Sequence, residues 1–259
     1  LREPGQEAKE DFASGSKAAA AGGYTRVATM PNTNPVIDTA ALVKAMQKRA
    51  EEDAVVHIEI IGAVTKGQKG EEMAEVGDMT EAGAIAFSDD GHFTKSAKVL
   101  LNCYDYLRTF DKVIINHDEE PSLVEEGVMN ESHRSAMLGM KGRPTVAEDI
   151  AVARDIMLAE YADAKVHVAH ISSARAVDIV RQAKARGVKV TAEATPQHMT
   201  MTDDCVELFD SSTKINPPLR EQKDVDAVLE GLKDGTIDCI VTGHSPHAQE
   251  EKDREYIYA

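Results

Sequence analysis

The amino-acid sequence predicts an α/β fold with a parallel sheet, of the kind found in a (β/α)8 barrel with one strand–helix unit missing. Short runs rich in Val, Ile and Ala alternate with longer amphipathic segments about seven times along the 259 residues. Several runs are almost continuously apolar, which is typical of strands covered on both faces. No Gly-x-Gly-x-x-Gly follows the first strand and no P-loop motif occurs, so a nucleotide-binding doubly wound fold lacks its usual signature.

Seven short apolar runs are the predicted strands. Each is bounded by polar or turn-forming residues, and each is followed by a longer segment before the next run begins. In chain order they are Tyr24–Met30, Val55–Ala63, Ala84–Ser88, Val113–His117, Lys165–Ile171, Val188–Ala194 and Ile237–Thr242.

The clearest predicted helix is Thr145–Tyr161, which opens with Thr145-Val-Ala-Glu148, the pattern of a capping box. Ser173–Arg186 begins with a Ser cap and ends at Gly187, and Asp224–Asp234 ends at Gly235. Along the first of these helices the apolar residues recur every three or four positions: Val146, Ile150, Ala153, Met157 and Tyr161. Three further helices are expected at Glu7–Ala21, Thr39–Asp53 and Lys95–Phe110.

Composition excludes several classes of protein. Acidic side chains outnumber basic ones by 45 to 29, for a net charge of −16, which disfavours an electrostatic nucleic-acid binder or a protein of anionic membrane surfaces. No stretch approaches the roughly 18 apolar residues of a membrane helix, and the N-terminus does not resemble a signal peptide. Cys103, Cys205 and Cys239 are widely spaced, and we interpret them as small buried hydrophobes in a reducing, cytoplasmic setting.

The organisation predicted is a single, incomplete barrel domain over residues 1–259. No low-complexity linker or shift in composition marks a boundary, and barrels of roughly 250 residues fold as one domain. The chain begins at Leu1 rather than Met and opens directly into turn-like residues, so we expect it to be cut from a longer one.

Residues that can bind a metal gather at the ends of the predicted strands. Asp89-Asp90-Gly91 follows the third strand, His117 ends the fourth and His170 lies at the end of the fifth. In (β/α)8 barrels the chemistry sits at the C-terminal ends of the strands, and imidazole and carboxylate groups are ligands for zinc or a similar ion. Alone, a strand-end His is more often structural and an Asp-Gly pair is a common turn. Together they predict a metal cluster. His57 and His133 are expected to be structural or at the surface, and His92, which could reach the site from the Asp-Gly turn, is expected at the surface.

Eight stretches spread along the chain carry a family resemblance. They are Leu1–Gly5, Gly22–Thr25, Met30–Pro35, Phe87–Gly91, Val168–Ser172, Thr195–His198, Ile215–Arg220 and His244–His247. In this order they resemble the dihydroorotases of the amidohydrolase superfamily, specifically the longer bacterial class. The resemblance implies a TIM (β/α)8 barrel of the metal-dependent hydrolase type, with its first strand and its C-terminal part missing from this chain.

The resemblance also implies an activity and a set of site residues. The reaction is the interconversion of N-carbamoyl-L-aspartate and dihydroorotate, in de novo pyrimidine biosynthesis, with one or two Zn²⁺ or another divalent metal. The metal ligands carry over to Asp90, His117 and His170. The substrate-binding positions carry over to Arg2, Asn32, Asn216 and His247, with the Arg2 guanidinium on the substrate carboxylate. A homodimer is expected.

Two departures from the family pattern put activity in question. The family places His-x-His immediately before Leu-Arg-Glu-Pro-Gly, and this chain begins at Leu1. The family also has Thr-Asp-His-Ala-Pro-His where this chain has Thr242-Gly243-His244, so Gly243 stands at the position of the catalytic Asp and no catalytic residue is intact. Losing an acid–base group typically costs 10²–10⁴-fold in rate, so we expect this chain to be impaired or inactive.

Two alternatives stay open. One is a non-catalytic dihydroorotase-like scaffold, a partner of aspartate transcarbamoylase. The other is a hydantoinase-type or allantoinase-type hydrolase of another cyclic ureide. Those cousins usually bridge their metals with a carboxylated Lys where this chain has Asp90, and this difference favours a dihydroorotase.

Overall fold

Parallel strands form the centre of each of the two units into which the chain divides. The computed structural model describes residues 1–259. Unit 1 comprises Leu1–His117, Tyr161–Lys165 and His244–His247, and unit 2 comprises Asp118–Glu160, Val166–Gly243 and Ala248–Ala259. All seven predicted strands are present, although each is shorter than its apolar run.

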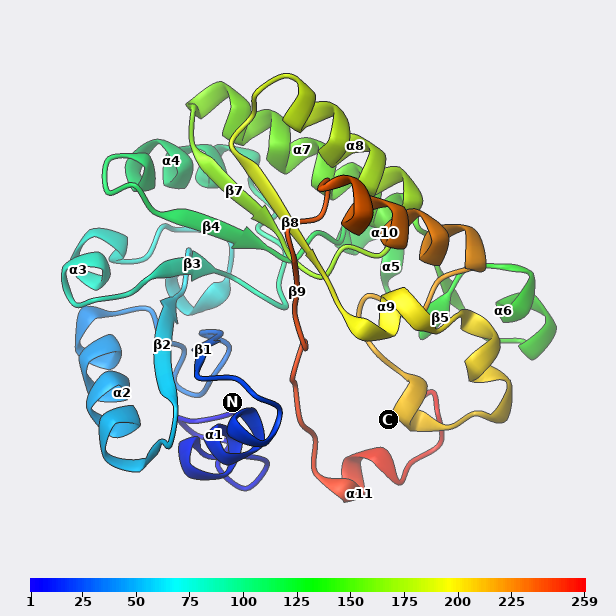
Figure 1. Ribbon diagram of the computed structural model, residues 1–259, viewed down its shortest axis with the longest axis horizontal. Coiled ribbons are helices and arrows are strands. Elements are labelled where there is room, and N and C mark those ends of the chain that lie inside the picture. Colours follow the sequence, from blue (N-terminus) through cyan, green and yellow to red (C-terminus); the bar gives the residue numbers. More distant parts are fainter. The chain divides into compact units, whose positions relative to one another are not determined.

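Unit 1 contains four parallel strands that pair in sequence order. Arg26 lies opposite His57, Ile61 opposite Ala86, and Phe87 opposite Ile114. Helix α2 packs on β2 and α4 on β4, as Figure 1 shows in blue and green. The elements are α1 (Phe12–Ala21), β1 (Arg26–Thr29), α2 (Ala40–Asp53), β2 (His57–Gly62), η1 (Lys66–Gln68), α3 (Val76–Glu81), β3 (Ala86–Ser88), α4 (Ala97–Arg108) and β4 (Val113–Asn116).

Unit 2 contains three parallel strands that pair in sequence order, β7, β8 and β9, and a separate parallel pair, β5 and β6. His167 lies opposite Thr191, and Glu193 lies opposite Cys239. Helix α8 packs on β8 and against α10. The elements are α5 (Pro121–Val124), β5 (Met129–Asn130), α6 (His133–Leu138), β6 (Gly142–Arg143), α7 (Val146–Ala162), β7 (Lys165–Val168), α8 (Ala174–Ala185), β8 (Val190–Ala194), α9 (Pro196–Thr200), η2 (Asp203–Leu208), η3 (Ser211–Thr213), α10 (Gln222–Asp234), β9 (Cys239–Ile240) and α11 (Gln249–Lys252).

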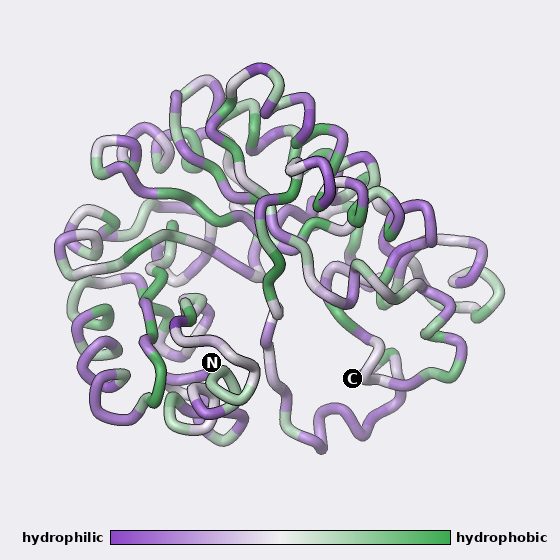
Figure 2. The backbone as a smooth tube through the Cα atoms, viewed as in Figure 1, coloured by the Kyte–Doolittle hydropathy of each residue, from purple (hydrophilic) through white to green (hydrophobic).

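Hydrophobic side chains of the strands and of the facing helices form the cores of the two units. Figure 2 shows a hydrophobic stretch along β4, with hydrophilic residues on the outer turns of the helices. In unit 1 the fully buried side chains include Ile60, Phe87 and Tyr104. In unit 2 they include Val168 and Val180, which lie on a strand and on the helix that covers the sheet. No helix is both long enough and apolar enough to span a bilayer.

The six predicted helices are present, and two of their predicted ends are confirmed in detail. The Ser173 hydroxyl accepts a hydrogen bond from the Ala176 N–H and so caps α8. Gly235 ends α10 with φ +78, a left-handed conformation that glycine adopts without steric cost. The sequence did not predict α3, α5, α6 or the two-stranded pair β5–β6, because these elements are short.

The predicted capping box at the start of α7 is wrong. The Glu148 carboxylate instead accepts hydrogen bonds from the backbone N–H groups of Ser172 (2.8 Å) and Ser173 (2.9 Å), just before α8. The side chain is buried, so its hydrogen-bonding capacity must be met inside the protein. Glu148 therefore satisfies the N-terminal donors of a neighbouring helix rather than those of its own.

The apolar repeat predicted α7 correctly, but that stripe is exposed. The larger residues of the repeat include Met157, which is 66% exposed, and Tyr161, which is 81% exposed. The buried face is the opposite one, and it is mostly alanine: Ala147, Ala151, Val152, Ile156, Ala159 and Ala162.

The interpretation of the cysteines as buried hydrophobes is only partly right. All three are free and Cys103 is buried, but Cys239 is exposed.

Two neighbouring residues of α7 test this assignment. Ile156→Ala should lower the free energy of unfolding by about 2–5 kcal/mol, because it leaves a cavity in a core position that is 1% exposed. Met157→Ala is the matched control and should stay within about 0.5 kcal/mol of the wild type. Urea denaturation followed by circular dichroism measures both. Equal losses for the two variants would contradict the assignment.

Candidate functional site

Asp90 and His117 lie side by side at the carboxyl ends of β3 and β4. These strands are adjacent and parallel, with Ser88 opposite Ile115, so the residues that follow them emerge at the same edge of the sheet. The Asp90 Oδ1 and His117 Nδ1 atoms are 3.4 Å apart, and both side chains are largely buried. A carboxylate oxygen and an imidazole nitrogen at this separation are suited to share a divalent cation.

Asp89 and Asp90 are adjacent, but their carboxylates do different things. The Asp89 carboxylate accepts hydrogen bonds from the N–H groups of Val64 and Thr65 and from the Thr65 hydroxyl, at 2.9, 3.0 and 2.6 Å. Burial raises the pKa of Asp89, and these hydrogen bonds oppose the rise. Asp89 thus fixes the loop after β2 and leaves Asp90 as the carboxylate that faces His117.

His170 belongs to unit 2 and lies in a turn beyond the end of its strand. The predicted strand ran to Ile171, but β7 ends at Val168, and His170 has φ +34. A non-glycine residue in this region carries a backbone cost of roughly 1–2 kcal/mol. Ile171 donates its N–H to the Glu193 carbonyl (2.8 Å), which anchors the turn to β8. The turn, and not strand alternation, therefore determines the position of the imidazole.

The segments that carry Arg2, Asn32 and His247 lie together in unit 1. Arg2 Nε donates to the Pro246 carbonyl (3.0 Å), and a terminal nitrogen of its guanidinium donates to the Ser245 hydroxyl (2.7 Å). The Asn34 N–H donates to the Pro4 carbonyl (3.0 Å), which joins the first residues to the loop that contains Asn32. These hydrogen bonds join the three segments that carry the predicted residues.

Gly5 is required where the first residues approach that loop. Its φ is +89, and a Cβ at this position would lie 1.8 Å from the Asn34 carbonyl oxygen. Only glycine permits such a close approach of two backbone segments.

Asn216, the fourth predicted substrate residue, lies in unit 2. Its side-chain oxygen accepts a hydrogen bond from Arg143 (3.1 Å), whose guanidinium also pairs with Glu119. The next residue is held as well, because His198 Nε2 donates to the Pro217 carbonyl (2.9 Å). Since a carbonyl can only accept, Nε2 carries the proton, and Nδ1 accepts from the Thr195 hydroxyl (2.8 Å).

Burial lowers the pKa of His198 to about 4, so the imidazole is neutral at neutral pH. The sequence placed this histidine near a strand end, and the structure gives it a positioning role. The His198 side chain is 3% exposed, and its hydrogen bond to Pro217 holds the segment that carries Asn216.

A buried ion pair that sequence reasoning missed supports the turn at His170. Arg220 donates from Nε to the Ser172 hydroxyl (3.0 Å) and from a terminal nitrogen to Glu148 (3.2 Å), while its other terminal nitrogen reaches Asn130 (3.0 Å). Burial alone would raise the pKa of Glu148, but Arg220 and the hydrogen bonds from Ser172 lower it below its usual value. The only signal in the sequence was that Arg220 ends one of the family-like stretches.

Gly243 carries no side chain at the position predicted for a catalytic acid. Its φ is +58, and a Cβ there would lie 3.3 Å from Thr195 Cγ2. His57, His92 and His133 are exposed, so the surface alternative holds for His57 and His133.

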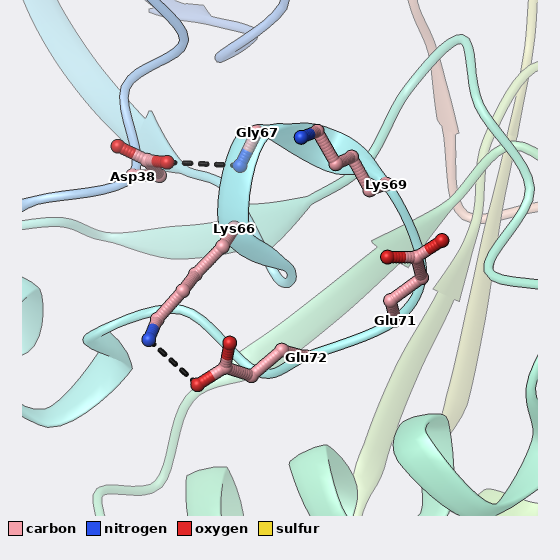
Figure 3. A pocket seen from close by; sticks show the side chains of 6 residues that line it. All are labelled: Asp38, Lys66, Gly67, Lys69, Glu71 and Glu72. Carbon is pink, nitrogen blue, oxygen red and sulfur yellow. Dashed lines mark hydrogen bonds and ion pairs between the residues drawn. The ribbon is translucent and has the colours of Figure 1, made fainter.

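A separate hollow in unit 1 is lined by charged residues around η1, as Figure 3 shows. Lys66 Nζ lies 2.6 Å from Glu72 Oε1, and the Gly67 N–H donates to Asp38 (2.8 Å). The hollow contains none of the predicted site residues. Its lysine–glutamate pair is solvent-exposed, and exposed pairs of this kind contribute little to stability.

Comparison with known proteins identifies the family. The sequence model of a family described as "Dihydro-orotase-like" matches residues 1–176, which is more than half of the chain.

The chain belongs to the dihydroorotase-like family.

Proteins named dihydroorotase align with the chain over its whole length. Dihydroorotases of Ruminiclostridium cellulolyticum and Pelotomaculum thermopropionicum are 51% and 53% identical over 259 residues. The chain spans 60% of the length of each.

Solved structures confirm the fold class predicted for this dihydroorotase-like chain. The L-hydantoinase from Arthrobacter aurescens superimposes with a TM-score of 0.82 at 24% identity, over 94% of this chain and 55% of the hydantoinase. A D-hydantoinase from Thermus sp. gives 0.75 at 24% identity, over 94% of this chain and 55% of that one. At these identities the likeness concerns the fold alone, which is the α/β barrel type with parallel strands.

The lowered pKa of His198 predicts how the free energy of unfolding depends on pH. Its pKa is about 4 in the folded state and about 6.5 when unfolded, so the unfolded chain binds more protons between these values. Its contribution to the free energy of unfolding should fall by about 3 kcal/mol as the pH is lowered from 6.5 to 4. His198→Gln should remove this part of the slope, whereas His57→Gln, at an exposed site, should leave it. The measurement is urea denaturation across this pH range, and an unchanged slope in His198→Gln would refute the assignment.

Proposed function

We propose that the chain is the catalytic barrel, a single but incomplete domain over residues 1–259, of a dihydroorotase. In the synthetic direction the ureido nitrogen of N-carbamoyl-L-aspartate bonds to the carbon of the side-chain carboxyl group, and water leaves to give dihydroorotate. The reverse reaction hydrolyses the ring amide. The observation that carries the proposal is the identity of about half of all residues with proteins named dihydroorotase, over the full 259 positions.

The proposed metal ligands are Asp90, His117 and His170, for one or two Zn²⁺ or another divalent cation. The separation of 3.4 Å between Asp90 Oδ1 and His117 Nδ1 supports this, because the two donor atoms are close and of the types that zinc prefers. When bound, such an ion supplies a hydroxide nucleophile at neutral pH and polarises the amide carbonyl.

The proposed role of Arg2 is to hold the carboxylate of the substrate that does not react. A guanidinium presents a planar set of donors that fits a carboxylate, and the bonds from Arg2 to Pro246 and Ser245 fix the orientation of that plane. Asn32, Asn216 and His247 complete the substrate site in this proposal. Arg143 and His198 act as positioning residues for the Asn216 segment, through their bonds to Asn216 and Pro217.

Gly243 supports a second candidate, a non-catalytic scaffold that associates with aspartate transcarbamoylase. A glycine can neither bind a metal nor transfer a proton, so the proposed site has no group to move a proton between water and the leaving nitrogen. A hydantoinase-type or allantoinase-type hydrolase is the third candidate. A homodimer and a cytoplasmic location belong to the same proposal, and light scattering after size-exclusion chromatography tests the former.

A substrate panel distinguishes the enzyme candidates. The protein as its gene encodes it, loaded with Zn²⁺, should turn over dihydroorotate in preference to hydantoin and allantoin, at a low rate. His117→Asn removes a proposed ligand, so metal affinity and turnover should fall together. The loss should exceed the 10- to 100-fold that is typical when a residue hydrogen-bonded to a metal ligand is removed. His57→Asn is the matched control and should keep both. Strong turnover of hydantoin with none of dihydroorotate would replace the proposal with the third candidate.

The substitution Gly243→Asp tests whether one missing carboxylate limits the rate. We expect dihydroorotate turnover to rise by about 10²–10⁴-fold, the usual contribution of an acid–base group. The positive φ of this residue makes the substitution cost roughly 1–2 kcal/mol, which a thermal unfolding curve checks. Gly235→Asp is the control, because Gly235 also has a positive φ and no neighbouring atom near its Cβ position. A folded, metal-loaded Gly243→Asp protein without turnover of any ring would favour the scaffold.

A further inference from the structure

A second cluster of metal-binding side chains lies on the sheet of unit 2. His167 is opposite Thr191 in the pairing of β7 with β8, and Glu193 is opposite Cys239 in the pairing of β8 with β9. Because side chains alternate along a strand, Thr191 and Glu193 point to the same side of β8. His167 and Cys239 therefore share that side. It is the side away from the core, since the alternate residues Val190, Ala192 and Ala194 are buried.

The donor atoms of this cluster are close enough to share one ion. One atom each from His167, Glu193 and Cys239 lies within 4.8 Å of the others. His167 Nε2 is 3.1 Å from Glu193 Oε2, and both side chains are 14% exposed. Cys239 is exposed, so an ion can reach the cluster from solvent.

Thr191 orients the imidazole for this role. His167 Nδ1 and Thr191 Oγ1 are 2.7 Å apart and hydrogen bonded, so the ring is held with Nε2 directed at the Glu193 carboxylate. Metal-binding histidines almost always make such a bond through their other nitrogen, because it fixes the tautomer and the ring orientation.

We propose that His167, Glu193 and Cys239 form a second metal site, which binds a thiophilic divalent cation such as Zn²⁺ or Cd²⁺. One imidazole nitrogen, one carboxylate oxygen and one thiolate sulfur are three protein ligands of a tetrahedral site, with water as the fourth. The thiolate selects against Mg²⁺ and Ca²⁺, which prefer oxygen ligands. The site is distinct from the proposed Asp90, His117 and His170 ligands, and it does not depend on dihydroorotase activity.

Binding at this site has a defined proton balance. Cys239 binds the ion as a thiolate, so one proton passes from its sulfur to solvent for each ion bound. Affinity should therefore increase with pH, and a bound cation would offset the repulsion between the thiolate and the Glu193 carboxylate.

Cobalt spectroscopy tests the site without any assay of activity. Co²⁺ added to the protein as its gene encodes it should give a thiolate-to-cobalt charge-transfer absorption in the near ultraviolet. Cys239→Ser should abolish the absorption, while Cys205→Ser, the control at a free cysteine elsewhere in unit 2, should keep it. The proposed Asp90, His117 and His170 ligands contain no sulfur, so failure of the proposed function would leave this result unchanged. Absence of the band in the wild type, or its persistence in Cys239→Ser, would overturn the second site.

A second set of measurements tests the site without removing any of its three ligands. Thr191→Val keeps all three ligands and removes the hydroxyl that orients His167, so Zn²⁺ affinity should fall about 10- to 100-fold in competition with a chromophoric chelator. Zn²⁺ should also slow the alkylation of Cys239 in the wild-type protein and leave Cys205 unaffected. Unchanged affinity in Thr191→Val, or equal alkylation of Cys239 with and without Zn²⁺, would show that His167 and Glu193 form only a hydrogen-bonded pair.

Discussion

The buried carboxylate of Glu148 is the constraint on which much of unit 2 depends. A buried carboxylate is costly unless hydrogen bonds and an opposite charge compensate it, and this one receives both from Arg220, Ser172 and Ser173. These partners tie the first turn of α7 to the start of α8 and to the segment that ends in Arg220. His170 lies two residues before Ser172, so the same network defines where its imidazole emerges.

The chain uses many of its acidic side chains in this structural way, which explains why net charge said little about function. Asp89 holds the loop after β2, and only its neighbour Asp90 faces a histidine. A sequence pattern can place two adjacent acids at the end of a strand, but it cannot say which carboxylate the adjacent loop will use. The difference lies in long-range hydrogen bonds to Val64 and Thr65, which leave no local mark in the sequence.

The strands and the site residues were predictable where a short stretch of sequence determines the structure. Apolar runs marked seven of the nine strands, and the parallel pairing of β3 with β4 made the meeting of Asp90 and His117 foreseeable. The face of α7 was not foreseeable from hydropathy alone. Its buried side is rich in alanine, and the larger apolar residues such as Met157 face outward. Small residues allow a helix to approach its neighbours closely, and this packing depends on volume rather than on hydrophobicity. Arg220 and His198 were missed as positioning residues for a related reason, since their partners are distant in sequence.

Two buried carboxyl groups and one buried histidine of unit 2 respond to acid in opposite directions. Burial raises the pKa of Asp155 to about 6, and burial together with the Asp155 charge raises that of the neighbouring Asp118. The folded state therefore holds more protons on these carboxyl groups than the unfolded state, so their contribution to stability increases as the pH falls through 6. His198, with a pKa of about 4, contributes in the opposite sense over nearly the same range. The pH dependence of the total stability therefore sums contributions of opposite sign. Only the difference between a variant and the wild type isolates either contribution.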